Sequence, residues 1–153
     1  MKIRVQTEAF DLGTEVDAMR QGRTDIGAIA SFVGLARDMN EGSGVSAMTL
    51  EHYPGMTEKA LAALVDEACT RWTLRDVTVI HRVGRLLPGD PIVLAAVASS
   101  HRGEAFAACE FIMDYLKTQA PFWKKEETAD GERWVEARAS DDAAAARWAS
   151  PDT

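Results

Sequence analysis

Residues 115–126 constrain the fold of this chain most strongly, because a helical pattern ends within them and a strand pattern begins. Apolar residues recur at three- and four-residue spacing from about 103 to 118, which predicts a helix with one buried face. Pro121 cannot continue that helix. We therefore expect Lys117 in the last helical turn and Lys124 on the strand that follows.

Lysines flank the apolar run Pro121-Phe122-Trp123 in a chain whose formal net charge is -7. A lysine beside desolvating surface loses hydration, and its pKa falls toward neutrality, so it can act as an acid, a base or a nucleophile. The cluster therefore predicts an anion site. A cation in a last helical turn is also favoured by the helix dipole without any function. Because strand residues alternate between faces, Lys124 and Lys125 must point to opposite sides, and the sequence does not say which points inward.

The remaining patterns alternate between strand and helix and contain no repeat or linker that would mark a second domain, so we expect one domain over residues 1–153. Hairpin signals stand beside strand-helix units, which favours an α+β fold with a mainly antiparallel sheet over a doubly wound parallel one. We expect strands at 2–6, 26–34, 47–53, 77–83, 92–99, 122–128 and 132–138, and further helices at 14–21, 57–72 and 141–148. Thr14 and Thr57 are the expected helix caps.

Two further places carry candidate anion ligands. Arg37 follows a buried strand and stands at the mouth of residues 38–44, whose small and polar composition predicts a mobile loop. His101 and Arg102 stand where a strand gives way to a helix, and free backbone N–H groups at a helix start favour anions. The alternative is that Ser100 only caps this helix and the two side chains decorate a surface turn.

Composition excludes several classes of protein. The net negative charge argues against general binding of nucleic acid or anionic membranes. The amino terminus lacks the apolar core of a signal peptide, and no run reaches the ~18 apolar residues of a membrane span, so we expect a soluble cytoplasmic protein. The two cysteines are not in a zinc-ligand spacing, and no glycine-rich nucleotide loop occurs, so we expect neither metal nor cofactor.

Several motifs in fixed order resemble the large, catalytic subunit of molybdopterin synthase. They are Leu50 to Ala60 (LEHYPGMTEKA), Val79 to Gly84 (VIHRVG), Pro88-Gly89-Asp90, Ser100-His101-Arg102, and Phe111 through Lys124. The resemblance extends from about residue 3 to Trp148. It implies an α/β hammerhead-type fold with an additional antiparallel β subdomain, which agrees with the α+β expectation.

The resemblance also implies an activity. Members of that family convert cyclic pyranopterin monophosphate into molybdopterin by forming a dithiolene, as sulfurtransferases of molybdenum cofactor biosynthesis. The sulfur comes from the C-terminal thiocarboxylate of a small ubiquitin-like partner subunit that ends in Gly-Gly. Two large subunits form a homodimer, and each carries one small subunit, giving a heterotetramer.

Carried over by motif, the family's functional positions fall on residues from four parts of this chain. Lys117 and Lys124 match the catalytic lysines. The substrate-binding positions match Arg37, His101, Arg102, Lys125, Glu126, Leu35 and Ala36. Leu35 and Ala36 stand where the family often has a lysine and a valine, so a contact there is expected from the backbone. Arg138 is a candidate to complete the site of a second protomer.

Two other functions stay open from the residues alone. A binding module could dock a ubiquitin-like tail or a small anion without chemistry, and a phosphate-ester hydrolase could use the same cations. Only the sulfurtransferase requires a thiocarboxylated partner to form a dithiolene, whereas a hydrolase releases phosphate without any sulfur donor. The order of the two sulfur additions, the division of acid and base roles between the lysines, and closure of loop 38–46 over substrate are not encoded in any motif.

Overall fold

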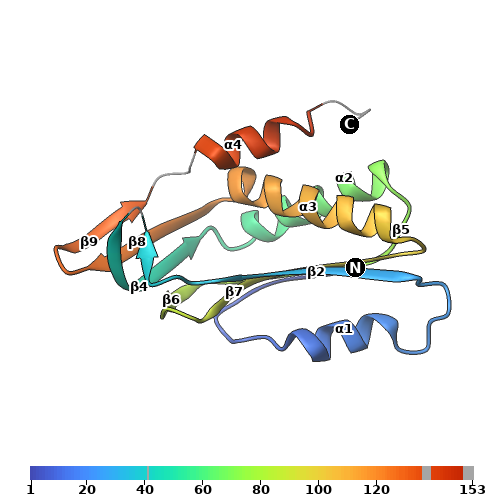
Figure 1. Ribbon diagram of the computed structural model, residues 1–153, viewed down its shortest axis with the longest axis horizontal. Helices are drawn as coiled ribbons and strands as arrows, with labels where there is room; N and C mark the ends of the chain where they lie inside the picture. Colours follow the sequence, from blue (N-terminus) through green and yellow to red (C-terminus); the bar gives the residue numbers. More distant parts are fainter. Residues whose placement is uncertain (41, 136–138, 150–153) are drawn as a thin grey trace.

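The computed structural model describes residues 1–40, 42–135 and 139–149. Its centre is a four-stranded sheet with the order β1-β5-β7-β2 (Figure 1). These strands are β1 (Lys2–Gln6), β5 (Leu74–Arg82), β7 (Pro91–Ser99) and β2 (Ala28–Leu35). Only β1 and β5 run parallel in this sheet, and its other pairs are antiparallel, which confirms the expectation of a mainly antiparallel sheet.

Helices cover both faces of the central sheet (Figure 1). One face carries α2 (Met56–Arg71) and α3 (Arg102–Gln119), and the other carries α1 (Leu12–Arg20). Alternate residues of β7 serve the two layers, because side chains along a strand point to opposite faces. Val93, Ala95 and Val97 join the α2–α3 core, while Leu94, Ala96 and Ala98 pack with Met19 of α1. The middle of β7 is therefore apolar on both faces.

A second, antiparallel sheet lies at one end of the first (Figure 1). Its order is β3-β4-β8-β9, and β6 also pairs with β4. The strands are β3 (Met39–Asn40), β4 (Ser43–His52), β6 (Gly84–Leu86), β8 (Phe122–Thr128) and β9 (Gly131–Val135). The α+β prediction with an added antiparallel sheet is confirmed.

The junction between α3 and β8 follows the sequence prediction. Ala120 ends α3 in an extended conformation, with φ -77° and ψ 138°, just before Pro121. Lys117 lies in the last turn of the helix, and Lys124 lies on the strand. One short connection therefore holds the two lysines on adjacent elements. The turn of the β8–β9 hairpin ends at Gly131, whose φ of 107° favours glycine.

The expected loop at residues 38–44 is wrong in part. Met39 and Asn40 pair with Gly44 and Ser43, and the Val45 amide donates to the Asp38 carbonyl at 2.7 Å. Asn40 is buried, because its amide binds a carboxylate on β8. A partner so far along the chain leaves no trace in the local polar composition, which is why that composition indicated a loop.

Both expected threonine caps are wrong. α1 begins after Asp11, whose Oδ1 accepts from the Thr14 amide at 2.8 Å, so Thr14 is inside the helix. α2 begins after Gly55, which has φ 84°, and the Glu58 carboxylate accepts from the Gly55 amide at 2.6 Å. Acidic side chains thus satisfy backbone N–H groups at these helix starts.

The last helix, α4 (Ala139–Ala146), packs on α3 (Figure 1). A helix was expected here at 141–148, and the helix itself is confirmed, two residues nearer the N-terminus. Trp148 donates from Nε1 to Asp114 at 2.6 Å and makes edge contacts with Trp72 and Phe111. Arg138, proposed from the sequence as a residue shared between protomers, lies outside the described residues. None of the helices in the described ranges is both long and apolar enough to cross a membrane.

Candidate active site

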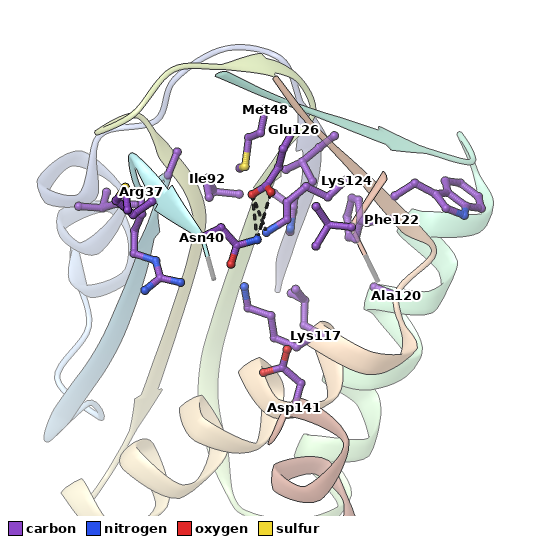
Figure 2. Close-up of a pocket in the computed structure, with 18 residues that line it drawn as sticks. Arg37, Asn40, Met48, Ile92, Lys117, Ala120, Phe122, Lys124, Glu126 and Asp141 are labelled. Atoms are coloured by element: carbon purple, nitrogen blue, oxygen red, sulfur yellow. Dashed lines mark hydrogen bonds and ion pairs between the residues drawn. The ribbon is translucent and has the colours of Figure 1, made fainter. Parts of the chain in front are cut away.

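A cavity of about 410 Å³ opens where the C-terminal end of α3 meets the second sheet (Figure 2). Apolar side chains from several elements form much of its wall, among them Met48, Leu50, Ile92, Leu116 and Phe122. The titratable and amide side chains that line it are Arg37, Asn40, His81, Lys117, Lys124, Glu126 and Asp141. The cavity thus gathers three cations and two carboxylates in a partly apolar wall, where charges interact more strongly than in water.

Strand alternation on β8 decides between the two neighbouring lysines. Phe122, Lys124 and Glu126 share the face that lines the cavity. Lys125 points to the other side, where its Nζ lies 3.5 Å from Glu132 and 5.4 Å from the ring centroid of Trp134. Lys124 is therefore the inward lysine, and the structure does not bring the Lys125 side chain to the cavity.

Glu126 is the most buried charge in this wall, with 3% of its surface exposed. Asn40 donates from Nδ2 to both carboxylate oxygens, at 3.1 and 3.0 Å. Arg133 donates to Oε1 from Nε at 3.2 Å and from Nη2 at 3.1 Å. Lys124 Nζ lies 4.0 Å from Oε2, beyond hydrogen-bond distance (Figure 2). Glu126 therefore connects β3, β9 and the inward lysine.

His81 contributes a neutral ring to the cavity wall. Its Nδ1 lies 2.8 Å from the Arg82 carbonyl, which can only accept, so Nδ1 carries the proton. The ring stacks on Phe122 with centroids 3.8 Å apart. Burial, with a smaller contribution from the positive charge of Lys117, lowers the pKa of His81 to about 4. At neutral pH the histidine thus offers an acceptor nitrogen rather than a fourth cation.

Arg37 lines the cavity just beyond the end of β2, together with Leu35 and Ala36. The Ala36 amide donates to the Asp90 carbonyl at 2.9 Å, and the Gly89 amide donates to the Ala36 carbonyl at 2.7 Å. The backbone before Arg37 is therefore bound to the turn between β6 and β7. This anchoring fixes where the arginine enters the site.

His101 and Arg102 do not line the cavity of their own chain. Both are exposed at the start of α3, and at 1.5 Å per residue Arg102 lies about 22 Å along the helix from Lys117. The alternative reading of Ser100 as a helix cap is also wrong, because His101 is the N-cap residue and Ser100 Oγ accepts from Arg75 at 3.2 Å.

Three cavity residues were missed in the sequence. Asn40 was hidden in the apparent loop, and Asp141 enters from α4 (Figure 2). His81 was interpreted as a core or edge histidine, but it continues the β5 alternation of Val77 and Val79, which face α3. That alternation is a signal that could have placed it. Asn40 and Asp141 reach the cavity through contacts between segments that are far apart in the sequence, so no local pattern marked them.

The geometry defines a class of protein: an α+β protein with a partly enclosed, cationic cavity suited to an anionic substrate. Within the described residues, no three His, Cys, Asp or Glu side chains are grouped so that they could hold a metal ion. Residues 5–119 match the model of the MoaE protein family. The chain belongs to this family of molybdopterin synthase catalytic subunits, which are enzymes.

Individual relatives agree with this assignment. The molybdopterin synthase catalytic subunit of Ralstonia nicotianae is 70% identical over 146 residues, which cover 95% of this chain and 83% of that one. The solved molybdopterin biosynthesis MoaE protein of Burkholderia ambifaria MC40-6 is 62% identical, with a TM-score of 0.83 and coverage of 97% and 98%. A protein-protein complex of subunits 1 and 2 of the molybdopterin-converting factor from Helicobacter pylori 26695 contains a chain with the same fold, at 18% identity, a TM-score of 0.73 and coverage of 89% and 91%.

Proposed function

We propose that this chain is the catalytic subunit of a cytoplasmic molybdopterin synthase. It converts cyclic pyranopterin monophosphate into molybdopterin with sulfur from the C-terminal thiocarboxylate of a small ubiquitin-like subunit. The observation that carries the proposal is the convergence on one cavity of Lys117 from α3, Lys124 from β8 and Arg37 from the segment after β2. Family membership supports the reaction, and the Helicobacter complex supports a small partner.

The reaction brings two anions together, and the cations of the cavity account for how they can meet. The thiocarboxylate attacks a carbon of a substrate that carries a cyclic phosphate, and opening of that phosphate adds negative charge. Fixed cations in a water-poor cavity stabilise such charge without reorganising. In the proposed arrangement Arg37 holds the phosphate, Lys117 meets the thiocarboxylate tail, and Lys124 stabilises the leaving oxygen. His81, kept neutral, accepts a hydrogen bond without adding a charge.

His101 and Arg102 require a second copy of the chain if they act on the same substrate. Their distance from Lys117 along α3 excludes a direct contact within one protomer. We infer that in the homodimer implied by family resemblance they enter the cavity of the partner protomer. The working unit is then a heterotetramer, with one small subunit on each catalytic chain.

The test is reconstitution with defined components. The wild-type chain, mixed with a thiocarboxylated partner and cyclic pyranopterin monophosphate, is expected to yield the dithiolene product. Lys117→Ala is expected to lose ~10²–10³ in rate, the usual cost of one such contact. Lys59→Ala, an exposed lysine on α2, is the matched control and should retain activity. Tail binding without product would indicate a binding module, and phosphate release without a sulfur donor would indicate a hydrolase.

A further inference from the structure

Arg133 lies beside Glu126 on the same face of the β8–β9 hairpin, just outside the residues that line the cavity. It pairs with Glu126 in the β8–β9 register and contacts Glu126 Oε1 through both Nε and Nη2. Arg133 does not line the cavity, whereas Glu126, Asn40 and Lys124 do. The carboxylate thus has an arginine from the neighbouring strand, outside the cavity lining, and a lysine of its own strand that lines the cavity. Only the arginine is within hydrogen-bond distance, because Lys124 Nζ stands at 4.0 Å.

A carboxylate as buried as Glu126 needs a counter-charge, since desolvation makes an unpaired buried charge costly. Arg133 supplies that charge from outside the cavity, and Asn40 adds two hydrogen bonds. Without Arg133, Lys124 would be the cation nearest to the Glu126 carboxylate. It would close from 4.0 Å to direct contact, and its ammonium would be drawn toward the wall.

We propose that Arg133 is a positioning residue for Lys124: it neutralises Glu126 from the neighbouring strand, so that the Lys124 ammonium is not drawn into closer contact with Glu126 and stays directed at the substrate anion. The inference rests on the proposed function for its consequence in catalysis, but the position of Lys124 can be measured independently. In this arrangement Glu126 is a structural link between Arg133 and Lys124. Its acceptor oxygens serve Asn40 and Arg133.

The experiment removes the arginine that pairs with Glu126 on the cavity side of β8, and compares the result with removal of the arginine that pairs with Glu127 on the other side. Arg133→Gln, Arg133→Lys and the double variant Glu126→Gln/Arg133→Gln test the proposal. Arg85→Gln is the matched control, because Arg85 holds the neighbouring Glu127 at 3.0 Å on the solvent side. Each variant is assayed with thiocarboxylated partner for kcat and KM toward cyclic pyranopterin monophosphate, and its thermal unfolding midpoint is measured.

Arg133→Gln is expected to lower kcat/KM by about tenfold or more, and Arg133→Lys by less. The kcat/KM of the double variant is expected to be several-fold higher than that of Arg133→Gln, because without the carboxylate nothing draws Lys124 toward the wall. Arg85→Gln should match the wild type. Activity of Arg133→Gln equal to Arg85→Gln would overturn the proposal, as would a double variant no better than Arg133→Gln. Either result would leave Arg133 with a role in folding alone.

Crystals of the same chains separate this inference from the proposed reaction. In Arg133→Gln, Lys124 Nζ is expected to move to ~2.8 Å from Glu126, and in Arg85→Gln it should stay where it is in the wild type. An unmoved lysine in Arg133→Gln would sink the positioning role whatever the reaction. A wild-type chain that makes no dithiolene, with the lysine shift still present, would refute the proposed function and leave the positioning role standing.

Discussion

Asn40 donates from Nδ2 to both carboxylate oxygens of Glu126, at 3.1 and 3.0 Å, across 86 positions of the chain. The contact ties the short β3–β4 hairpin to β8 (Figure 2). Arg37 precedes that hairpin, and Lys124 lies two residues before Glu126. This one amide therefore sets the spacing between the arginine and the inward lysine.

Asn40→Ala is expected to lower both stability and activity. Hydrogen bonds to a charged group contribute about 1.5–3 kcal/mol, and their loss leaves the buried carboxylate less well satisfied, so the free energy of unfolding should fall by about 2 kcal/mol. Urea denaturation measures this. Ser46→Ala is the control, because Ser46 Oγ bonds the Glu127 carbonyl at an exposed position. Equal losses for the two variants would contradict a special role for the Asn40 contact.

Lys124→Ala and Lys125→Ala are expected to differ strongly. Lys124 lines the cavity, and its loss removes a cation from the developing charge, at a cost of ~10²–10³ in rate. Lys125 lies on the opposite face with Glu132 and Trp134, so its replacement should cost less than about tenfold. Steady-state rates of dithiolene formation compare them. Comparable losses would mean that the strand presents its other face to the substrate.

The lysine pair illustrates what the sequence could predict. Helix periodicity, the Pro121 stop and strand alternation are local rules, so they placed Lys117 on a helix end and separated Lys124 from Lys125 correctly. They could not say which lysine faces inward, because that depends on which face of β8 lies over the end of α3. Packing of one element on another decided it.

The errors have the same physical origin. Residues 38–44 looked like a loop because Asn40 finds its partner on β8, far along the chain. His101 and Arg102 are a different case: the length of α3 keeps them from the cavity of their own protomer, and their role in substrate binding stays a prediction. Local patterns record neither distant hydrogen bonds nor the lengths that separate functional residues in space.

His81 is expected to make stability depend on pH in the acid range. Its pKa is about 4 in the folded protein, against an ordinary value of 6.5. Between these pH values the unfolded chain binds a proton that the folded chain does not. The contribution of neutral His81 to the free energy of unfolding is therefore fully present above pH 6.5. It falls as the pH drops toward 4, by up to about 3 kcal/mol. Urea unfolding at several pH values between 4 and 7 measures the slope.

The matched variant for this test is His81→Asn. The asparagine amide can still donate to the Arg82 carbonyl, but it does not titrate. The variant is expected to be less stable at pH 7, through loss of the stack on Phe122, and to show a smaller pH slope than the wild type. Identical slopes in the two proteins would show that another group accounts for the acid sensitivity.

Sharing of the site between two protomers predicts complementation between inactive variants. Lys117→Ala destroys the cavity of its own protomer, and Arg102→Ala removes the group that we assign to the cavity of the other. When the two are mixed and allowed to exchange, about half of the dimers are mixed, and each of these keeps one complete site. The mixture should thus recover about a quarter of the wild-type rate.

Lys117→Ala mixed with Lys124→Ala is the control for that experiment. Both of these lesions lie in the same cavity, so a mixed dimer has one damaged lysine in each site and no complete site. This mixture should stay as inactive as its parents. If the Lys117→Ala and Arg102→Ala mixture also stays at the parental level while native mass spectrometry detects the mixed dimers, Arg102 does not act across the interface. Its exposed position at the start of α3 would then require another explanation.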